Sequence, residues 1–226
     1  MPTGVVSGLR RETECLASPD GTYPEMLTFA GVGAERAAEG ARRLLAEGAG
    51  ALVSFGVCGG LAPQAHAGEL VLCDSVVDGD VRFQTDPAWR DTLRRRLGNA
   101  VPIIEGAVCG VDAMVASVAA KRALFEATGA VGCDMESHAV ARVAAEAGVP
   151  FMVLRAVSDP DTHDVPTWVL RCLTPVGGVR YGKLLGALAR RPWTLPAVIT
   201  LARNSKKAFA SLRSVARLAG PGLGGL

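Results

Sequence analysis

The feature that most constrains the fold is the alternation of short, largely apolar runs with segments rich in helix-forming residues. The runs show no regular alternation of polar and apolar residues, which indicates strands buried on both faces of a sheet. The predicted strands are residues 4–8, 26–31, 51–56, 69–77, 101–110, 130–135 and 149–158. The predicted helices are residues 34–47, 87–97, 117–128 and 136–147, with helical patterns continuing to about residue 220. We therefore predict an α/β fold of three layers, in which helices flank a mostly parallel or mixed central sheet.

The chain length fits one globular domain. Of the 226 residues, 49% are hydrophobic and 20% are charged, which excludes a disordered or fibrous chain. We predict one domain over residues 1–220, with a basic helical part at 165–220 and a flexible tail at 221–226. No uncharged apolar run is long enough for a membrane-spanning helix, so we expect none.

The start of the chain and its cysteines indicate a cytoplasmic protein. The first residues lack the basic segment and apolar stretch of a signal peptide. The six cysteines form no CxxC pair and lie mostly in apolar runs, so we expect free, buried thiols in a reducing compartment. We expect neither a metal nor a cofactor.

Ligands of open parallel sheets bind at the carboxyl ends of the strands, which directs attention to the residues that follow each predicted strand. Gly31 and Gly33 precede the predicted helix at 34–47, as glycines of phosphate-binding loops do. The third glycine of the dinucleotide fingerprint and the lysine of a Walker loop are absent. The pattern favours a tight turn that brings the backbone close to some other ligand.

Two longer segments, residues 54–77 and 132–159, carry a GG-containing strand end, a Met-Glu pair that opens a helix, and a strand that ends in RAVSD. In this order and spacing they resemble the nucleoside phosphorylase and nucleosidase superfamily, over roughly residues 4–160. The resemblance implies that the chain cleaves the N-glycosidic bond of a purine nucleoside, without a cofactor and as a homo-oligomer. Such a reaction needs an acid for the leaving base and a carboxylate that activates water.

The resemblance also implies roles for three acidic residues. Asp159 matches the acid that protonates the purine ring, although a plain Asp-Pro turn is the alternative. Glu136 matches the glutamate that accepts both ribose hydroxyls, or it is an acid favoured by the dipole of a helix start. Glu12 matches the glutamate that activates water, the alternative being that Glu12 and Glu14 are two exposed acids on an early helix. The remaining implied substrate-binding residues are Met135, Met114, Val115, Ser158, Gly59 and Gly33.

The attacking nucleophile is water or phosphate. Hexameric phosphorylases of this superfamily hold phosphate with an arginine and a serine, and this chain has Ser54 and Val57 at those positions. Together with Glu12, this favours water. Phosphate stays the alternative, because Arg10, Arg11 or Arg36 could supply a phosphate site.

Two segments, GLRRE at residues 8–12 and RRPWTLP at 190–196, resemble the hopanoid-associated branch of the superfamily. That branch implies cleavage of adenosylhopane to adenine and ribosylhopane. The alternatives are a methylthioadenosine or adenosylhomocysteine nucleosidase, a purine phosphorylase, and a non-enzymatic peripheral membrane protein.

The charge of the chain is divided unevenly. Residues 165–226 carry ten Lys/Arg and no Asp or Glu, whereas residues 1–164 carry 14 basic and 22 acidic residues. In the last predicted helix, apolar residues recur at spacings of three and four, with lysines and arginines on the other side. This pattern predicts either a basic helix on an anionic membrane, peripheral on the inner membrane, or a helix docked on the core. Nucleic acid is disfavoured because stacking aromatics are few.

Overall fold

The apolar runs form the strands of one mixed sheet in the computed structural model, which describes residues 1–18, 20–23, 25–162, 164–172 and 180–225. The strands are β1 (Thr3–Ser7), β2 (Met26–Ala30), β3 (Ala51–Gly60), β4 (Leu70–Asp78), β5 (Val81–Gln84), β6 (Ile103–Gly110), β7 (Gly132–Asp134) and β8 (Phe151–Asp159). The order is β2-β1-β3-β7-β6-β4-β5, and β8 pairs with both β3 and β4. The strands β3, β8, β4, β6 and β7 therefore pair in a closed circuit.

Most strand pairs are parallel, but β7 runs antiparallel to β3, and β4 runs antiparallel to β5 and β8. The predicted three-layer α/β fold with a mixed sheet is confirmed. The sequence pattern missed β5, because its residues are mostly exposed and form no continuous apolar run.

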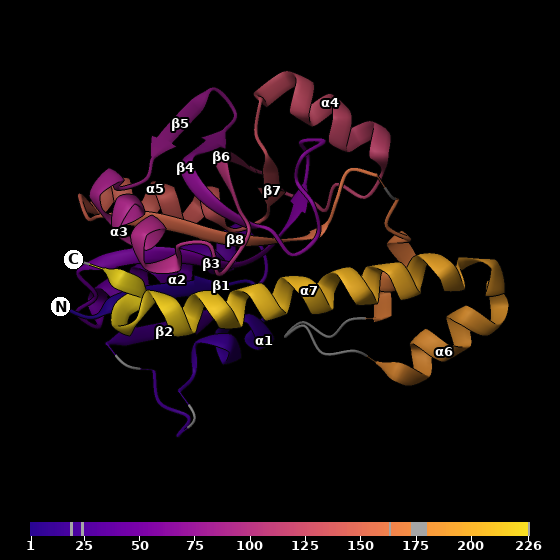
Figure 1. Cartoon of the computed structure of the whole chain (residues 1–226), viewed down its shortest axis with the longest axis horizontal. Helices are drawn as coiled ribbons and strands as arrows, with labels where there is room; N and C mark the ends of the chain where they lie inside the picture. Colours follow the sequence, from indigo (N-terminus) through magenta and orange to yellow (C-terminus); the bar gives the residue numbers. More distant parts are fainter. Residues whose placement is uncertain (19, 24, 163, 173–179, 226) are drawn as a thin grey trace.

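The helices and short 3-10 turns cover both faces of the sheet (Figure 1). They are α1 (Arg10–Thr13), η1 (Glu14–Leu16), α2 (Ala34–Ala46), α3 (Pro87–Leu97), α4 (Val118–Thr128), α5 (Ser137–Ala147), η2 (Thr167–Cys172), α6 (Tyr181–Arg190), η3 (Pro192–Thr194), α7 (Leu195–Ala219) and η4 (Pro221–Gly224). Successive strand residues point to opposite faces. Val6 packs in the core under α2 and α5, whereas its neighbour Val5 packs in the core under α3 and α7.

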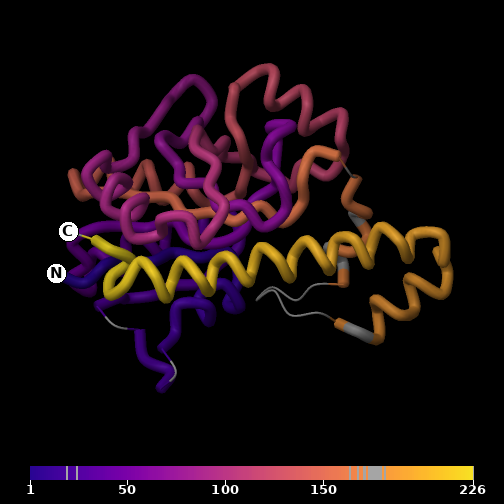
Figure 2. Tube along the Cα trace, viewed as in Figure 1, coloured from indigo at the N-terminus to yellow at the C-terminus, as the bar shows by residue number. Residues whose placement is uncertain are grey.

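The C-terminal helix α7 docks on the core with only part of its length. Phe209, Leu212 and Val215, in its second half, are buried against the sheet. Its first half and α6 form a hairpin that extends beyond the body of the molecule (Figures 1 and 2). Within the described part of the chain, no helix has the length and apolar character needed to span a membrane.

The predicted flexible tail at 221–226 is wrong for residues 221–225, and Leu226 lies outside the described residues. Leu223 is buried, and its carbonyl oxygen accepts a hydrogen bond of 2.9 Å from the indole N–H of Trp89. The Thr3 hydroxyl donates to the carbonyl oxygen of Gly222 at 3.0 Å. A glycine-rich composition is typical of frayed ends, but here the small residues let the chain end pack against α3 and β1.

Candidate active site

A cavity of about 250 Å³ lies at the carboxyl ends of β1, β3, β6, β7 and β8. It is lined by Gly8, Leu9, Glu12, Val32, Val57, Cys58, Gly59, Val111, Met114, Val115, Cys133, Asp134, Met135, Glu136, Ser158 and Asp159. All predicted site residues except Gly33 line this cavity. The backbone N–H of Gly33 donates to Glu136 Oε1 at 2.9 Å, so Gly33 contacts the site through that carboxylate. The strand ends therefore bring together residues from the whole first 160 positions.

Glu12 lies in α1 and is buried, with both carboxylate oxygens fixed by backbone donors. The N–H of Val57 donates to Oε1 and the N–H of Leu9 to Oε2, each at 2.8 Å. A Cβ on Gly56 would lie 2.6 Å from the Glu12 carboxyl carbon, so the carboxylate fits only because this strand residue is a glycine. Burial raises the pKa of Glu12 from 4.5 to about 7, against the opposing effect of Arg155. A carboxylate that titrates near neutrality suits a base that takes a proton from water.

Glu136 follows β7 and belongs to a buried network around Arg155 of β8. Arg155 Nε lies 2.9 Å from Asp134 Oδ2, and its NH2 group lies 3.5 Å from Glu136 Oε2. Burial raises the pKa of Glu136, and the Arg155 charge opposes that rise. Gly8 faces the same carboxylate, since a Cβ there would lie 3.0 Å from Glu136 Oε1. The network holds Glu136 in one orientation at the cavity wall.

Arg155 lies within the RAVSD motif, but the sequence pattern alone predicts no role for it. Its guanidinium donates to Ser54 Oγ at 2.7 Å and to the Val57 carbonyl oxygen at 3.2 Å, besides its contacts with Asp134 and Glu136. An arginine inside an otherwise apolar strand is the signal that could have identified it, because a buried guanidinium needs acidic partners.

Asp159 ends β8, and its side chain is held from two sides. The Ser158 hydroxyl donates to Oδ1 at 2.8 Å, and Lys121 Nζ lies 2.9 Å from Oδ2. Burial raises the pKa of Asp159, and the ammonium of Lys121 lowers it. Lys121 was not predicted, because nothing in the sequence shows that this helix residue points inward.

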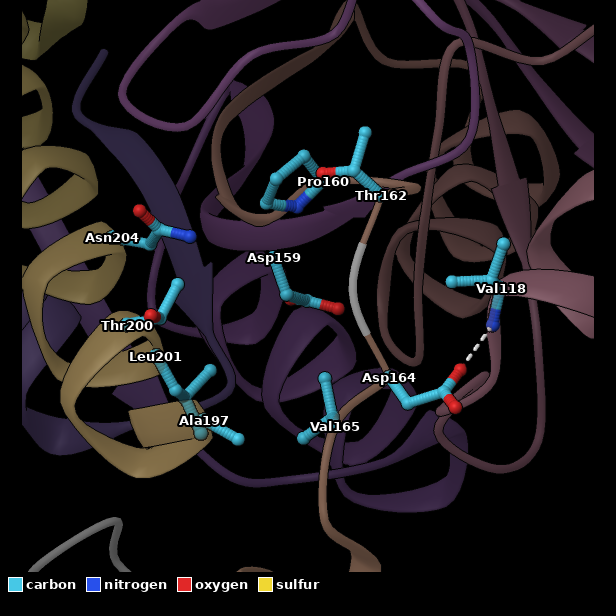
Figure 3. Close-up of a pocket in the computed structure, with 10 residues that line it drawn as sticks. All are labelled: Val118, Asp159, Pro160, Thr162, Asp164, Val165, Ala197, Thr200, Leu201 and Asn204. Atoms are coloured by element: carbon cyan, nitrogen blue, oxygen red, sulfur yellow. Dashed lines mark hydrogen bonds between the residues drawn. The ribbon is translucent and has the colours of Figure 1, made fainter. Parts of the chain in front are cut away.

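Asp159 also lines a second cavity, of about 360 Å³, between the start of α4, the chain after β8 and the first half of α7. Figure 3 shows Asp159 between the α7 side chains Thr200 and Asn204 and the chain that carries Asp164 and Val165. The Val118 N–H donates to Asp164 Oδ1 at 2.7 Å and joins α4 to that chain. The first half of α7 therefore faces the residue predicted as the acid across this cavity.

The apolar wall of the first cavity comes from the chain after β6 and β7. Met114 and Val115 lie half-buried after β6, and Met135 lies half-buried beside Glu136. Apolar side chains of this kind suit contact with the face of a purine or a sugar ring. No arginine or lysine is among the described residues that line this cavity. Arg10 instead pairs with the exposed Glu14, and Arg11 lies over the ring of Phe209.

No group of three or more His, Cys, Asp or Glu side chains with the geometry of a metal site occurs among the described residues. The six cysteines are free and buried.

Comparison with known proteins gives a family and a fold. The family model described as the phosphorylase superfamily matches residues 20–170. A futalosine hydrolase of Streptomyces coelicolor is 32% identical over 125 residues, covering 48% of this chain and 53% of the relative. A 5'-methylthioadenosine/S-adenosylhomocysteine nucleosidase of Shewanella sediminis is 27% identical over 136 residues, covering 51% and 59%. The chain thus matches only about half the length of these relatives.

Among solved structures, the 5'-methylthioadenosine/S-adenosylhomocysteine nucleosidase of Neisseria meningitidis, in complex with methylthio-immucillin-A, matches with a TM-score of 0.71 at 18% identity. That match covers 96% of this chain and 98% of the other. The futalosine hydrolase of Helicobacter pylori matches with a TM-score of 0.64 at 20% identity, over 70% and 84%. At these identities the likeness establishes the fold.

Proposed function

This chain belongs to the phosphorylase superfamily, and from that premise we propose that it cleaves the N-glycosidic bond of an adenine nucleoside. The observation that carries the proposal is that Glu12, Glu136 and Asp159 line one cavity of about 250 Å³. Burial raises the pKa of each of the three carboxyl groups, and it brings the pKa of Glu12 to about 7.

Each acid takes one part of the reaction. Asp159 gives its proton to a ring nitrogen of the purine as the bond from C1′ to the base breaks. Glu136 accepts hydrogen bonds from the ribose hydroxyls and holds the sugar in register. Glu12 accepts a proton from the attacking water, whose oxygen forms the new bond to C1′. One proton thus enters the site from water, and one leaves with the base.

Water is the proposed nucleophile rather than phosphate. A phosphate dianion needs cationic or multiple hydrogen-bonding donors, and arginine is the usual choice. The described lining of the cavity includes no arginine or lysine. Arg155 lies behind the lining with its guanidinium directed to Asp134, Ser54 and Glu136. Phosphorolysis would require this network to open.

For the substrate we propose adenosylhopane, cleaved to adenine and ribosylhopane in hopanoid biosynthesis. Its support is the resemblance of residues 8–12 and 190–196 to the hopanoid-associated branch. The names of the matched relatives favour a second candidate, a smaller adenine nucleoside such as 5'-methylthioadenosine.

Product analysis separates these candidates. The chain is incubated with adenosylhopane or 5'-methylthioadenosine, with and without phosphate, and products are identified by mass spectrometry. We expect adenine and ribosylhopane without phosphate, and one ¹⁸O in the sugar product when the water is labelled. Turnover of the smaller nucleoside alone would select the second candidate, whereas a sugar 1-phosphate would show phosphorolysis. Failure to release adenine from either substrate would contradict the proposed function.

We also propose that the chain binds an anionic membrane surface through the α6–α7 hairpin, residues 181–202. Trp193 at its turn is 74% exposed, and Leu185, Leu195 and Ile199 are exposed as well. Arg190 and Arg191 adjoin the tryptophan, and no acidic residue follows position 164. Tryptophan favours membrane–water interfaces, and a basic residue near anionic lipid contributes about 1 kcal/mol. The apolar face of the second half of α7 is buried in the core, so the hairpin is the part available to lipid.

Flotation with lipid vesicles tests this proposal. We expect binding to vesicles that contain anionic lipid, weaker binding as salt rises, and loss of most binding in Trp193→Ser. Val81→Ser is the matched control, because Val81 is also an exposed apolar residue but lies on β5, away from the hairpin. Equal binding to neutral and anionic vesicles, or no binding to either, would contradict the proposal. Dimer formation that depends on Trp193 without vesicle binding would assign the hairpin to a second copy of the chain.

A further inference from the structure

We propose that Lys121 is a positioning residue for the reaction: its buried ammonium fixes the Asp159 carboxyl group and stabilises the negative charge left there when the proton moves to the base. The inference rests on the proposed function, because it assumes that Asp159 is the acid. The contacts that carry it are independent of that assumption.

The ammonium group of Lys121 directs its hydrogen bonds to two consecutive residues, Asp159 and Pro160. Its Nζ lies 2.9 Å from Asp159 Oδ2, 2.9 Å from the Asp159 carbonyl oxygen and 3.0 Å from the Pro160 carbonyl oxygen. An ammonium has three donors, and three acceptors surround it here. Since the Ser158 hydroxyl holds Oδ1 at 2.8 Å, both oxygens of the Asp159 carboxyl group are fixed in place.

The burial of Lys121 is unusual for its helix. Within α4, all of which is described, Lys121 is the one buried side chain, with 0% exposed. The next residue, Arg122, points to solvent and pairs with Glu126 on the same helix. A lysine in the interior loses its hydration, which is unfavourable unless a charged partner compensates it. Asp159 is that partner, so the two charges depend on each other.

The charge balance around Asp159 gives the ammonium a chemical role. The other titratable groups that face Asp159 or line its two cavities are Glu12, Asp134, Glu136, Asp164, Cys58 and Cys133. Burial raises the pKa of both thiols, so they stay neutral, and the remaining groups are acids. Among the described residues, Lys121 is thus the cation that pairs with Asp159, whereas the other buried cation nearby, Arg155, pairs with Asp134 and Glu136. Lys121 is placed where negative charge develops as Asp159 gives up its proton.

The direction of the effect follows from two opposing influences. Burial raises the pKa of Asp159 and keeps the proton on, whereas Lys121 lowers this pKa and makes the proton easier to transfer. Without Lys121, the carboxyl group would stay protonated to higher pH and would be a weaker acid. Lys121→Met should therefore lower kcat and move the alkaline limb of the pH profile, where Asp159 loses its proton, to higher pH.

The test is a double-mutant cycle between Lys121→Met and Asp159→Asn, with kcat/KM measured across pH and stability measured by denaturation. We expect Lys121→Met to lower kcat/KM about 10- to 100-fold in the natural background and to have no further effect beside Asp159→Asn. Lys121→Arg, which keeps the charge, should keep the alkaline limb near its original pH. Arg122→Met, one residue along α4, is the matched control and should change neither quantity.

Stability gives a second measurement that needs no activity. Lys121→Met leaves the Asp159 carboxylate without its cation, so it should be less stable than the double variant, in which both charges are absent. If Lys121→Met does not fold, recovery of folding in the double variant supports the pairing. Three results would overturn the inference. The first is a folded Lys121→Met variant whose alkaline limb stays at its original pH. The second is an equal loss of kcat/KM from Lys121→Met in the natural and the Asp159→Asn backgrounds, and the third is a double variant no more stable than Lys121→Met. If Asp159→Asn keeps natural activity, the proposed acid itself is wrong, which is a different failure.

Discussion

Asp159→Asn is expected to lower kcat by roughly 10²–10⁴-fold, the usual contribution of a positioned acid. The asparagine is similar in shape and keeps a carbonyl oxygen for the Ser158 hydroxyl, but it has no proton of suitable acidity for the purine nitrogen. The measurement is adenine release at saturating substrate, with circular dichroism to confirm the fold. Asp164→Asn serves as the control, because Asp164 lies across the second cavity and holds the backbone of Val118. Natural activity in Asp159→Asn would exclude Asp159 as the acid.

Glu12→Gln is expected to lower kcat/KM by a similar factor, roughly 10²–10⁴-fold, because glutamine cannot accept a proton from water. The matched control is Glu14→Gln, two residues along the chain, where the carboxylate is exposed and pairs with Arg10 at 3.4 Å. The sequence left open whether Glu12 is an exposed acid like Glu14, whereas the structure buries Glu12 alone. Equal losses in both variants, or no loss in Glu12→Gln, would contradict the assignment.

The pH dependence of the natural enzyme follows from the same residue. Glu12 must be ionised to act as a base, and burial raises its pKa to about 7. We therefore expect kcat/KM to fall as the pH drops below about 7, and this acidic limb to be absent from the residual activity of Glu12→Gln. The same shift affects stability in the opposite sense. Because the folded chain holds the Glu12 proton more tightly than the unfolded chain, this residue lowers stability as pH rises from 4.5 to about 7.

Most of the site could be predicted because its residues follow strand ends, and strand ends are visible in the sequence. Glu136 is the second residue after β7, and Asp159 is the last residue of β8. The strands β1, β3 and β8 run parallel, so their carboxyl ends meet at one edge of the sheet. The strand β7 runs the opposite way and reaches the same edge because it pairs with the last residues of β3. The membership in the superfamily was predictable for the same reason, since its motifs lie at these positions.

Other features depend on side-chain packing that no local pattern records. Lys121 occupies a helix position that differs in no obvious way from that of the exposed Arg122, and only the approach of α4 to the end of β8 turns it inward. Gly33 was predicted to bind substrate, but its N–H donates a hydrogen bond to the Glu136 carboxylate. The burial of Leu223 likewise depends on Trp89, which lies far away in the sequence.

The sequence by itself determined the α/β class, the order of most strands along the chain and the residues gathered at their carboxyl ends. These follow from hydrophobic runs and turn residues, which act over a few positions. Only the tertiary structure decided that β8 lies between β3 and β4, that α7 docks with its second half and leaves its first half as a hairpin, and that Glu12 titrates near neutrality. Strand partners, helix docking and pKa shifts all depend on which groups lose their contact with water, and that is settled only when distant segments pack together.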